Sequence, residues 1–132
     1  LAPSLLGTCV EPSAFFPMLD QMMANQQTFL DKTGDLPQQQ LQAVENDPGK
    51  VATIIAKGLG YLDFVKARGL SEPQAIACLQ DPARIKALSD SAEKGSSEFQ
   101  VGGTPTFILN GKKIDANSYQ GVSEALMAAG AR

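Results

Sequence analysis

The side chains in this sequence that are best suited to covalent chemistry are the thiols of Cys9 and Cys78. Thiol-disulfide exchange sites commonly hold two cysteines in a Cys-x-x-C motif at a helix N-terminus, where the thiolate is stabilised. These two cysteines are 69 positions apart and cannot form that motif. The sequence has no histidine, which excludes Ser-His-Asp and Cys-His catalysis and the common zinc sites. We therefore expect no catalytic residue, metal site or cofactor within this chain.

A second motif lies near the C-terminus, where residues 101–111 read VGGTPTFILNG. The two glycines at 102 and 103 allow backbone angles that other residues avoid, so we expect a sharp bend there. Thr104 precedes Pro105 and is therefore pushed toward an extended conformation. Asn110-Gly111 is the strongest short signal for a β-hairpin, with residues 112–115 as the return strand. The motif predicts a hairpin that the chain enters through a Thr-Pro bond.

The rest of the chain is predicted to be helical, with five or six helices before the hairpin and one after it. Apolar residues at helical spacing predict one helix over residues 13–30 and another over residues 50–68. Ser71 with Gln74 has the spacing of a capping box, Asp81 precedes a proline at a helix start, and Ser118 is a candidate cap for the last helix. No internal repeat or linker is visible. The order of elements is therefore helices, one hairpin and a final helix.

Two features of this order carry further expectations. Gly58 and Gly60 fall inside the predicted helix over residues 50–68, and we interpret them as sites of close packing against a neighbouring helix. Phe107, Ile108 and Leu109 are consecutive apolar residues, as in a strand that is buried on both faces. A two-stranded hairpin is marginal in water without further strands or covering helices. Either the hairpin packs only on helices, or its partner strands lie outside this sequence.

Length and charge exclude several classes of function. The 132 residues fit one domain with a core of its own. The net charge is −3 and no basic run is longer than Lys112-Lys113, which argues against nucleic acid as a partner. No apolar run approaches the roughly 20 residues needed to span a bilayer, so we do not expect a membrane-embedded protein. No signal peptide is visible, and because the sequence begins at Leu1 without an initiator Met we interpret it as a processed chain or a fragment.

The segment GGTPTFILNGK, followed by a short helix, resembles the C-terminal end of DsbA-like thiol-disulfide oxidoreductases. The resemblance implies an α/β thioredoxin-like fold that is mostly helical in this chain. Residues 1–100 would form a helical insertion domain, and residues 101–132 the C-terminal part of the thioredoxin fold. It also implies that the Thr104–Pro105 bond is cis and that Thr104 and Pro105 bind substrate, with the backbone of Thr104 pairing with a substrate peptide.

The chain departs from this family in one respect, because the Cys-x-x-C that precedes the helical insertion is absent. The chain corresponds to the part that follows, so the segment alone is not expected to exchange disulfides. The resemblance implies the C-terminal portion of a periplasmic, or otherwise exported, oxidoreductase or isomerase that acts on cysteine-containing proteins. A redox partner in the membrane would fit the same family. Whether this chain is itself an enzyme is left open by its residues.

The resemblance also bears on the two cysteines, because some members carry a second cysteine pair in the helical region. It favours a structural disulfide between Cys9 and Cys78, and the alternative is two buried free thiols.

Two other functions stay open. One is a non-catalytic helical module that binds peptides through the same loop, and the other is a glutathione-dependent isomerase of the same fold.

Overall fold

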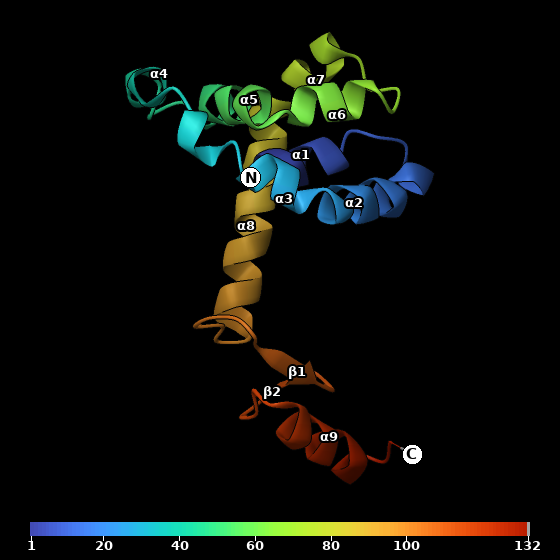
Figure 1. Ribbon diagram of the computed structural model, residues 1–132. Helices are drawn as coiled ribbons and strands as arrows, with labels where there is room; N and C mark the ends of the chain where they lie inside the picture. Colours follow the sequence, from blue (N-terminus) through green and yellow to red (C-terminus); the bar gives the residue numbers. More distant parts are fainter. Residues whose placement is uncertain (132) are drawn as a thin grey trace. The chain divides into compact units, whose positions relative to one another are not determined.

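The computed structural model describes residues 1–131, and the chain divides into two compact units, Leu1–Leu88 and Ser89–Arg132 (Figure 1). The division falls inside helix α8 (Pro82–Glu98). The elements of the first unit that precede α8 are α1 (Ala2–Gly7), η1 (Pro12–Ala14), α2 (Phe15–Ala24), α3 (Gln26–Leu30), η2 (Thr33–Asp35), α4 (Gln38–Ala43), α5 (Pro48–Leu59), α6 (Tyr61–Lys66) and α7 (Glu72–Leu79). The second unit contains the rest of α8, strands β1 (Phe107–Leu109) and β2 (Lys112–Ile114), and helix α9 (Tyr119–Ala128).

The core of the first unit is built around α1, which contacts α2, α5 and α7. Figure 1 shows α1 between α2 on one side and the α5–α7 group on the other. Leu5 and Leu6 are 1% and 0% exposed, and Leu79 of α7 is also fully buried. A helix of six residues is too short to be stable alone in water. The apolar contacts of its leucines with three other helices therefore stabilise α1.

An aromatic cluster joins α3 to α6, and Arg68, which stacks on this cluster, links it to α2. Phe29 of α3 lies 4.2 Å, between ring centroids, from Tyr61 and 5.4 Å from Phe64, both of α6. The guanidinium of Arg68 stacks over the Phe64 ring at 3.5 Å, and its Nε donates to Oε1 of Gln21 in α2 at 2.5 Å. Burial in this cluster raises the pKa of Tyr61. The cluster therefore ties α2 and α3 to α6.

The two long helices predicted in this unit are each interrupted. The expected helix over residues 50–68 is α5 and α6, separated by Gly60 with φ of +88°. Only glycine adopts this left-handed conformation without steric cost, and it ends α5. The expectation that Gly60 lies inside one continuous helix is therefore wrong. The helix predicted over residues 13–30 is also divided, because α2 ends at Ala24 and α3 begins at Gln26.

Close packing does explain two glycines of α5. A Cβ on Gly58 would lie 2.6 Å from Cδ2 of Leu36, and a Cβ on Gly49 would lie 2.9 Å from Cα of Gln80. Leu36 can move its flexible side chain, whereas the backbone of Gln80 follows α7 and cannot yield as easily. Gly49 therefore sets how closely α5 approaches the end of α7.

We expect Gly49→Ala to lower the free energy of unfolding by about 1–3 kcal/mol, because the added methyl overpacks a contact with backbone. Gly95→Ala is the matched control, since Gly95 lies inside α8 with no neighbour within 4 Å of a Cβ. That change should raise helix stability by about 0.5–1 kcal/mol. Urea denaturation of both variants measures the difference. Equal effects of the two substitutions would contradict this packing at Gly49.

Three of the predicted helix starts have the expected capping hydrogen bonds. Ser71 and Gln74 form the capping box of α7, with the Ser71 backbone N–H donating to Oε1 of Gln74 at 3.0 Å. Oδ1 of Asp81 accepts from the Ala83 N–H at 2.9 Å. Oγ of Ser118 accepts from the Gly121 N–H at 3.2 Å and caps α9. Each cap joins residues two or three positions apart, which is why the sequence pattern reveals it.

The second unit contains the predicted hairpin. Strands β1 and β2 pair antiparallel, with Phe107 opposite Ile114 and Leu109 opposite Lys112. The turn residues Asn110 and Gly111 have φ of 51° and 77°, the two positive values that a type I′ turn requires. The expected burial on both strand faces is not observed, because Phe107 is 37% and Ile108 is 42% exposed. The sheet of the described residues has two strands, so these side chains have no further strand to cover them.

Candidate functional site

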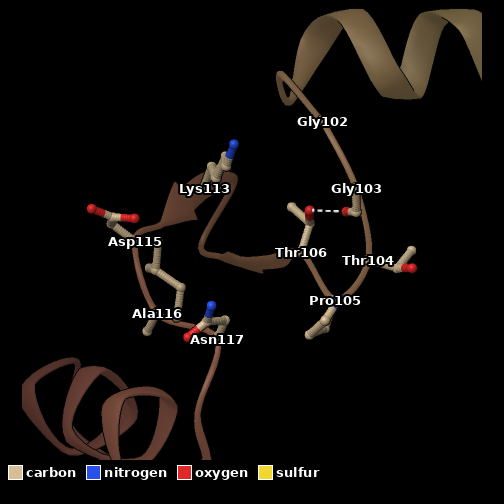
Figure 2. Close-up of a pocket in the computed structure, with 10 residues that line it drawn as sticks. Gly102, Gly103, Thr104, Pro105, Thr106, Lys113, Asp115, Ala116 and Asn117 are labelled. Atoms are coloured by element: carbon tan, nitrogen blue, oxygen red, sulfur yellow. Dashed lines mark hydrogen bonds between the residues drawn. The ribbon is translucent and has the colours of Figure 1, made fainter.

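The predicted substrate-binding residues Thr104 and Pro105 line a pocket of about 350 Å³ within the second unit (Figure 2). One wall is the loop from Gly102 to Thr106, which connects α8 to β1. The other wall is formed by β2 and the segment after it, through residues 113–117. The polar backbone of the loop therefore lies across the pocket from Lys113 of β2 and from Asp115, which directly follows β2.

The loop begins at an unusual residue, Gln100, whose φ is +50°. The Val101 N–H donates to the Ser96 carbonyl at 2.9 Å, the six-residue closure of a Schellman motif at a helix C-terminus. Glycine usually occupies this left-handed position, and glutamine there costs conformational energy. The chain bends at residues 103–105, as expected next to the two glycines, but neither Gly102 nor Gly103 has a positive φ. The left-handed residue is Gln100 instead.

Two side chains bond to the carbonyls of this loop. Oγ1 of Thr106 donates to the Gly103 carbonyl at 2.6 Å, a bond that Figure 2 shows within the loop. Nζ of Lys113 donates to the Gln100 carbonyl at 2.9 Å, and this bond links β2 to the end of α8. No pattern in the sequence singled out Gln100 or Lys113, because their contact joins residues 13 positions apart.

Thr104 and Pro105 are exposed at the middle of the loop, and the peptide bond between them is cis. This is the isomer that the resemblance implies. The Thr104 side chain points away from the β2 side of the pocket (Figure 2). Within residues 1–131, the backbone N–H and carbonyl of Thr104 have no hydrogen-bond partner. An extended peptide could therefore pair with this one residue through main-chain hydrogen bonds.

Cys9 and Cys78 form a disulfide, as the resemblance favours, with Cα atoms 6.3 Å apart. The bond joins Cys9, which lies just after the end of α1, to Cys78 of α7, and Cys78 is buried. Next to it, Arg84 donates to the Thr8 carbonyl at 3.0 Å and forms an ion pair with Asp81 at 3.2 Å. This region belongs to the first unit, whereas the Thr104 loop belongs to the second. The predicted residues therefore form two separate groups.

Across residues 1–131, acidic and cysteine side chains do not gather into a group of three that could hold a metal ion. No helix in the same range has the length and apolar character needed to cross a membrane.

Comparison with known proteins gives two matches. A family model described as thioredoxin matches residues 1–128. The chain is also similar to a solved structure, the protein-disulfide isomerase from Novosphingobium aromaticivorans, with a TM-score of 0.79 and 24% sequence identity. That alignment covers 97% of this chain and 66% of the other, so the chain spans about two thirds of the length of the solved protein. No curated protein matches the chain.

Proposed function

The chain belongs to the thioredoxin family, and on that premise we propose that it is the C-terminal portion of a protein thiol-disulfide oxidoreductase or isomerase. Its thioredoxin-like fold confirms the predicted fold class, in which a helical region precedes a hairpin and a last helix. We keep the division into a helical insertion domain, residues 1–100, and a C-terminal part, residues 101–132, as a proposal.

The observation that carries this proposal is the open backbone of Thr104. Its N–H and carbonyl are exposed and have no hydrogen-bond partner within residues 1–131, at the centre of a loop that lines a pocket. Backbone groups recognise any extended polypeptide, because every residue supplies the same donor and acceptor. A site of this kind suits cysteine-containing proteins of varied sequence as substrates.

We propose that the reacting thiolate of such an enzyme lies outside this chain, because its two cysteines are 69 positions apart and do not form a Cys-x-x-C motif. The apolar faces of the hairpin support the presence of further strands in the working protein. Phe107 and Ile108 are exposed, and an apolar pocket of about 470 Å³ lies between Phe107 and α9. Adding strands there would cover apolar surface that is otherwise left in water. We propose that the part of the protein that supplies those strands also carries the Cys-x-x-C, at the N-terminus of a helix.

A periplasmic or otherwise exported location fits this proposal. A disulfide between Cys9 and Cys78 persists most readily in an oxidising compartment. A redox partner in the membrane would then re-oxidise or reduce the catalytic pair, which are the two directions of thiol-disulfide exchange.

The test is a titration of the ¹⁵N-labelled chain with an unfolded peptide in which serine replaces cysteine, so that no covalent exchange occurs. We expect the largest amide shifts at Gly103, Thr104 and Thr106, with a dissociation constant of roughly 0.1–1 mM, since one loop supplies few hydrogen bonds. Amides of α4 in the first unit serve as the internal control. Shifts spread over both units without a maximum at Thr104 would overturn the assignment of this loop.

A non-catalytic peptide-binding module is the second candidate, favoured by the absence of a Cys-x-x-C pair from this sequence. The two functions differ in whether the natural protein contains a Cys-x-x-C pair in addition to the two cysteines of this chain. Measuring the intact mass of the natural protein, and the number of cysteines that are alkylated after reduction, distinguishes the two functions. A mass well above 13.9 kDa and two more reactive cysteines than this chain has would support the oxidoreductase. A mass of 13.9 kDa with two reactive cysteines would support the binding module.

A further inference from the structure

We infer that Lys113 is a positioning residue for the Thr104 loop, because its ammonium group holds the start of the loop in place. The inference rests on the proposed function, since it concerns how that loop presents the Thr104 backbone to a peptide. Lys113 itself need not touch the peptide. It acts through Gln100, whose carbonyl accepts its hydrogen bond at 2.9 Å.

The position of Lys113 in the hairpin is what makes this bond effective. Lys113 on β2 pairs with Ile108 on β1, and β1 starts directly after the loop. The loop leaves α8 at Gln100 and enters β1 at Phe107. The bond from Lys113 to Gln100 therefore connects the start of the loop to the hairpin, and the end of the loop continues into the same hairpin through β1.

The residues between these two ends supply little rigidity of their own. A Cβ on Gly102 or Gly103 would meet no atom within 4 Å, so neither glycine is held by side-chain packing. Glycine has more backbone freedom to lose than any other residue. Within the loop, the bond from Thr106 to the Gly103 carbonyl restricts only the segment next to the strand. On the entry side, the Val101 N–H is bonded to the Ser96 carbonyl, and Gln100 lies in a conformation that glutamine does not favour.

A loop that samples several conformations binds a peptide more weakly, because the binding-competent state is only a fraction of the total. Releasing the Gln100 carbonyl increases the number of conformations available to residues 100–103. The affinity for an extended peptide should therefore fall although the Thr104 backbone that pairs with the peptide is unchanged.

Lys112 provides a matched control on the same strand. It has the same charge as its neighbour and is also exposed, but it pairs with Leu109, and neighbouring residues of a strand point to opposite faces. Its ammonium has no hydrogen bond or ion pair within the described residues. Substituting Lys112 therefore removes the same charge without releasing the loop.

The experiment measures the dissociation constant of the serine-substituted peptide by amide shifts for three variants of the full chain. We expect Lys113→Met to weaken binding about three- to tenfold, the range for loss of one ordinary hydrogen bond, because solvent screens the charge at this exposed site. Lys113→Arg keeps a charged N–H donor and should stay within about twofold of the unsubstituted chain. Lys112→Met should also stay within about twofold. Hydrogen exchange at the Val101 amide, which donates to the Ser96 carbonyl beside Gln100, should accelerate in Lys113→Met alone.

The outcomes separate the two proposals. If the unsubstituted chain shows no localised binding at the loop, the proposed function fails. If it binds, but Lys113→Met and Lys112→Met have equal affinities and equal exchange rates, the positioning role is overturned and the proposed function stands. Cross-strand NOEs between Phe107 and Ile114 check that the hairpin is intact in each variant. If Lys113→Met disrupts them, Lys113→Gln replaces it and should weaken binding by the same mechanism.

Discussion

Reduction of the Cys9–Cys78 disulfide is expected to lower the free energy of unfolding of the first unit by about 4 kcal/mol. The bond closes a loop with a sequence separation of 69, and opening it restores conformational freedom mainly to the unfolded chain. Urea denaturation with and without a phosphine reductant measures the loss as a shift of the midpoint. An effect of this size is a large share of the 5–15 kcal/mol that typically stabilises a domain.

A variant without either thiol is the control for this experiment. Cys9→Ala combined with Cys78→Ala should unfold at the same urea concentration with and without reductant, close to the midpoint of the reduced protein. Alkylation confirms that the bond has opened in the unsubstituted chain. If two thiols react and the midpoint has not moved, the disulfide does not stabilise the first unit.

Leu79→Ala is expected to lower the free energy of unfolding by about 3 kcal/mol, within the 2–5 kcal/mol found for buried leucines. Leu79 is 0% exposed and lies in α7, which packs against α1, α5 and α6. The substitution removes apolar contacts and leaves a cavity between helices whose backbones are also held by the disulfide. That restraint limits how far the helices can collapse into the space. Urea denaturation under oxidising conditions measures the loss.

Leu30→Ala is the matched control, because Leu30 is 51% exposed at the end of α3. It should lower the free energy of unfolding by less than about 1 kcal/mol. A similar loss in both variants would contradict the burial of Leu79 in the core of the first unit. Leu79 and Cys78 are neighbours, so their effects should not add when Leu79→Ala is measured in reduced protein.

The features that residue type and spacing alone predict correctly depend on short-range interactions. The caps at Ser71, Asp81 and Ser118 each bond a backbone N–H two or three positions away, and Asn110-Gly111 sets its turn through its own backbone angles. These signals depend on residue type and spacing, which the sequence displays directly. The break at Gly60 was missed because glycine is compatible both with a helix interior and with the left-handed residue that ends a helix.

The amino-acid sequence by itself determined the caps, the hairpin turn and the absence of both histidine and a Cys-x-x-C pair. Only the tertiary structure decided which distant groups meet: Cys9 with Cys78 across 69 positions, and Lys113 with Gln100 across 13. It also left Phe107 and Ile108 exposed, although their apolar run is typical of a buried strand. The physical reason is that local backbone preferences act within a few residues. Contacts between distant residues and the burial of a strand depend on how the whole chain packs.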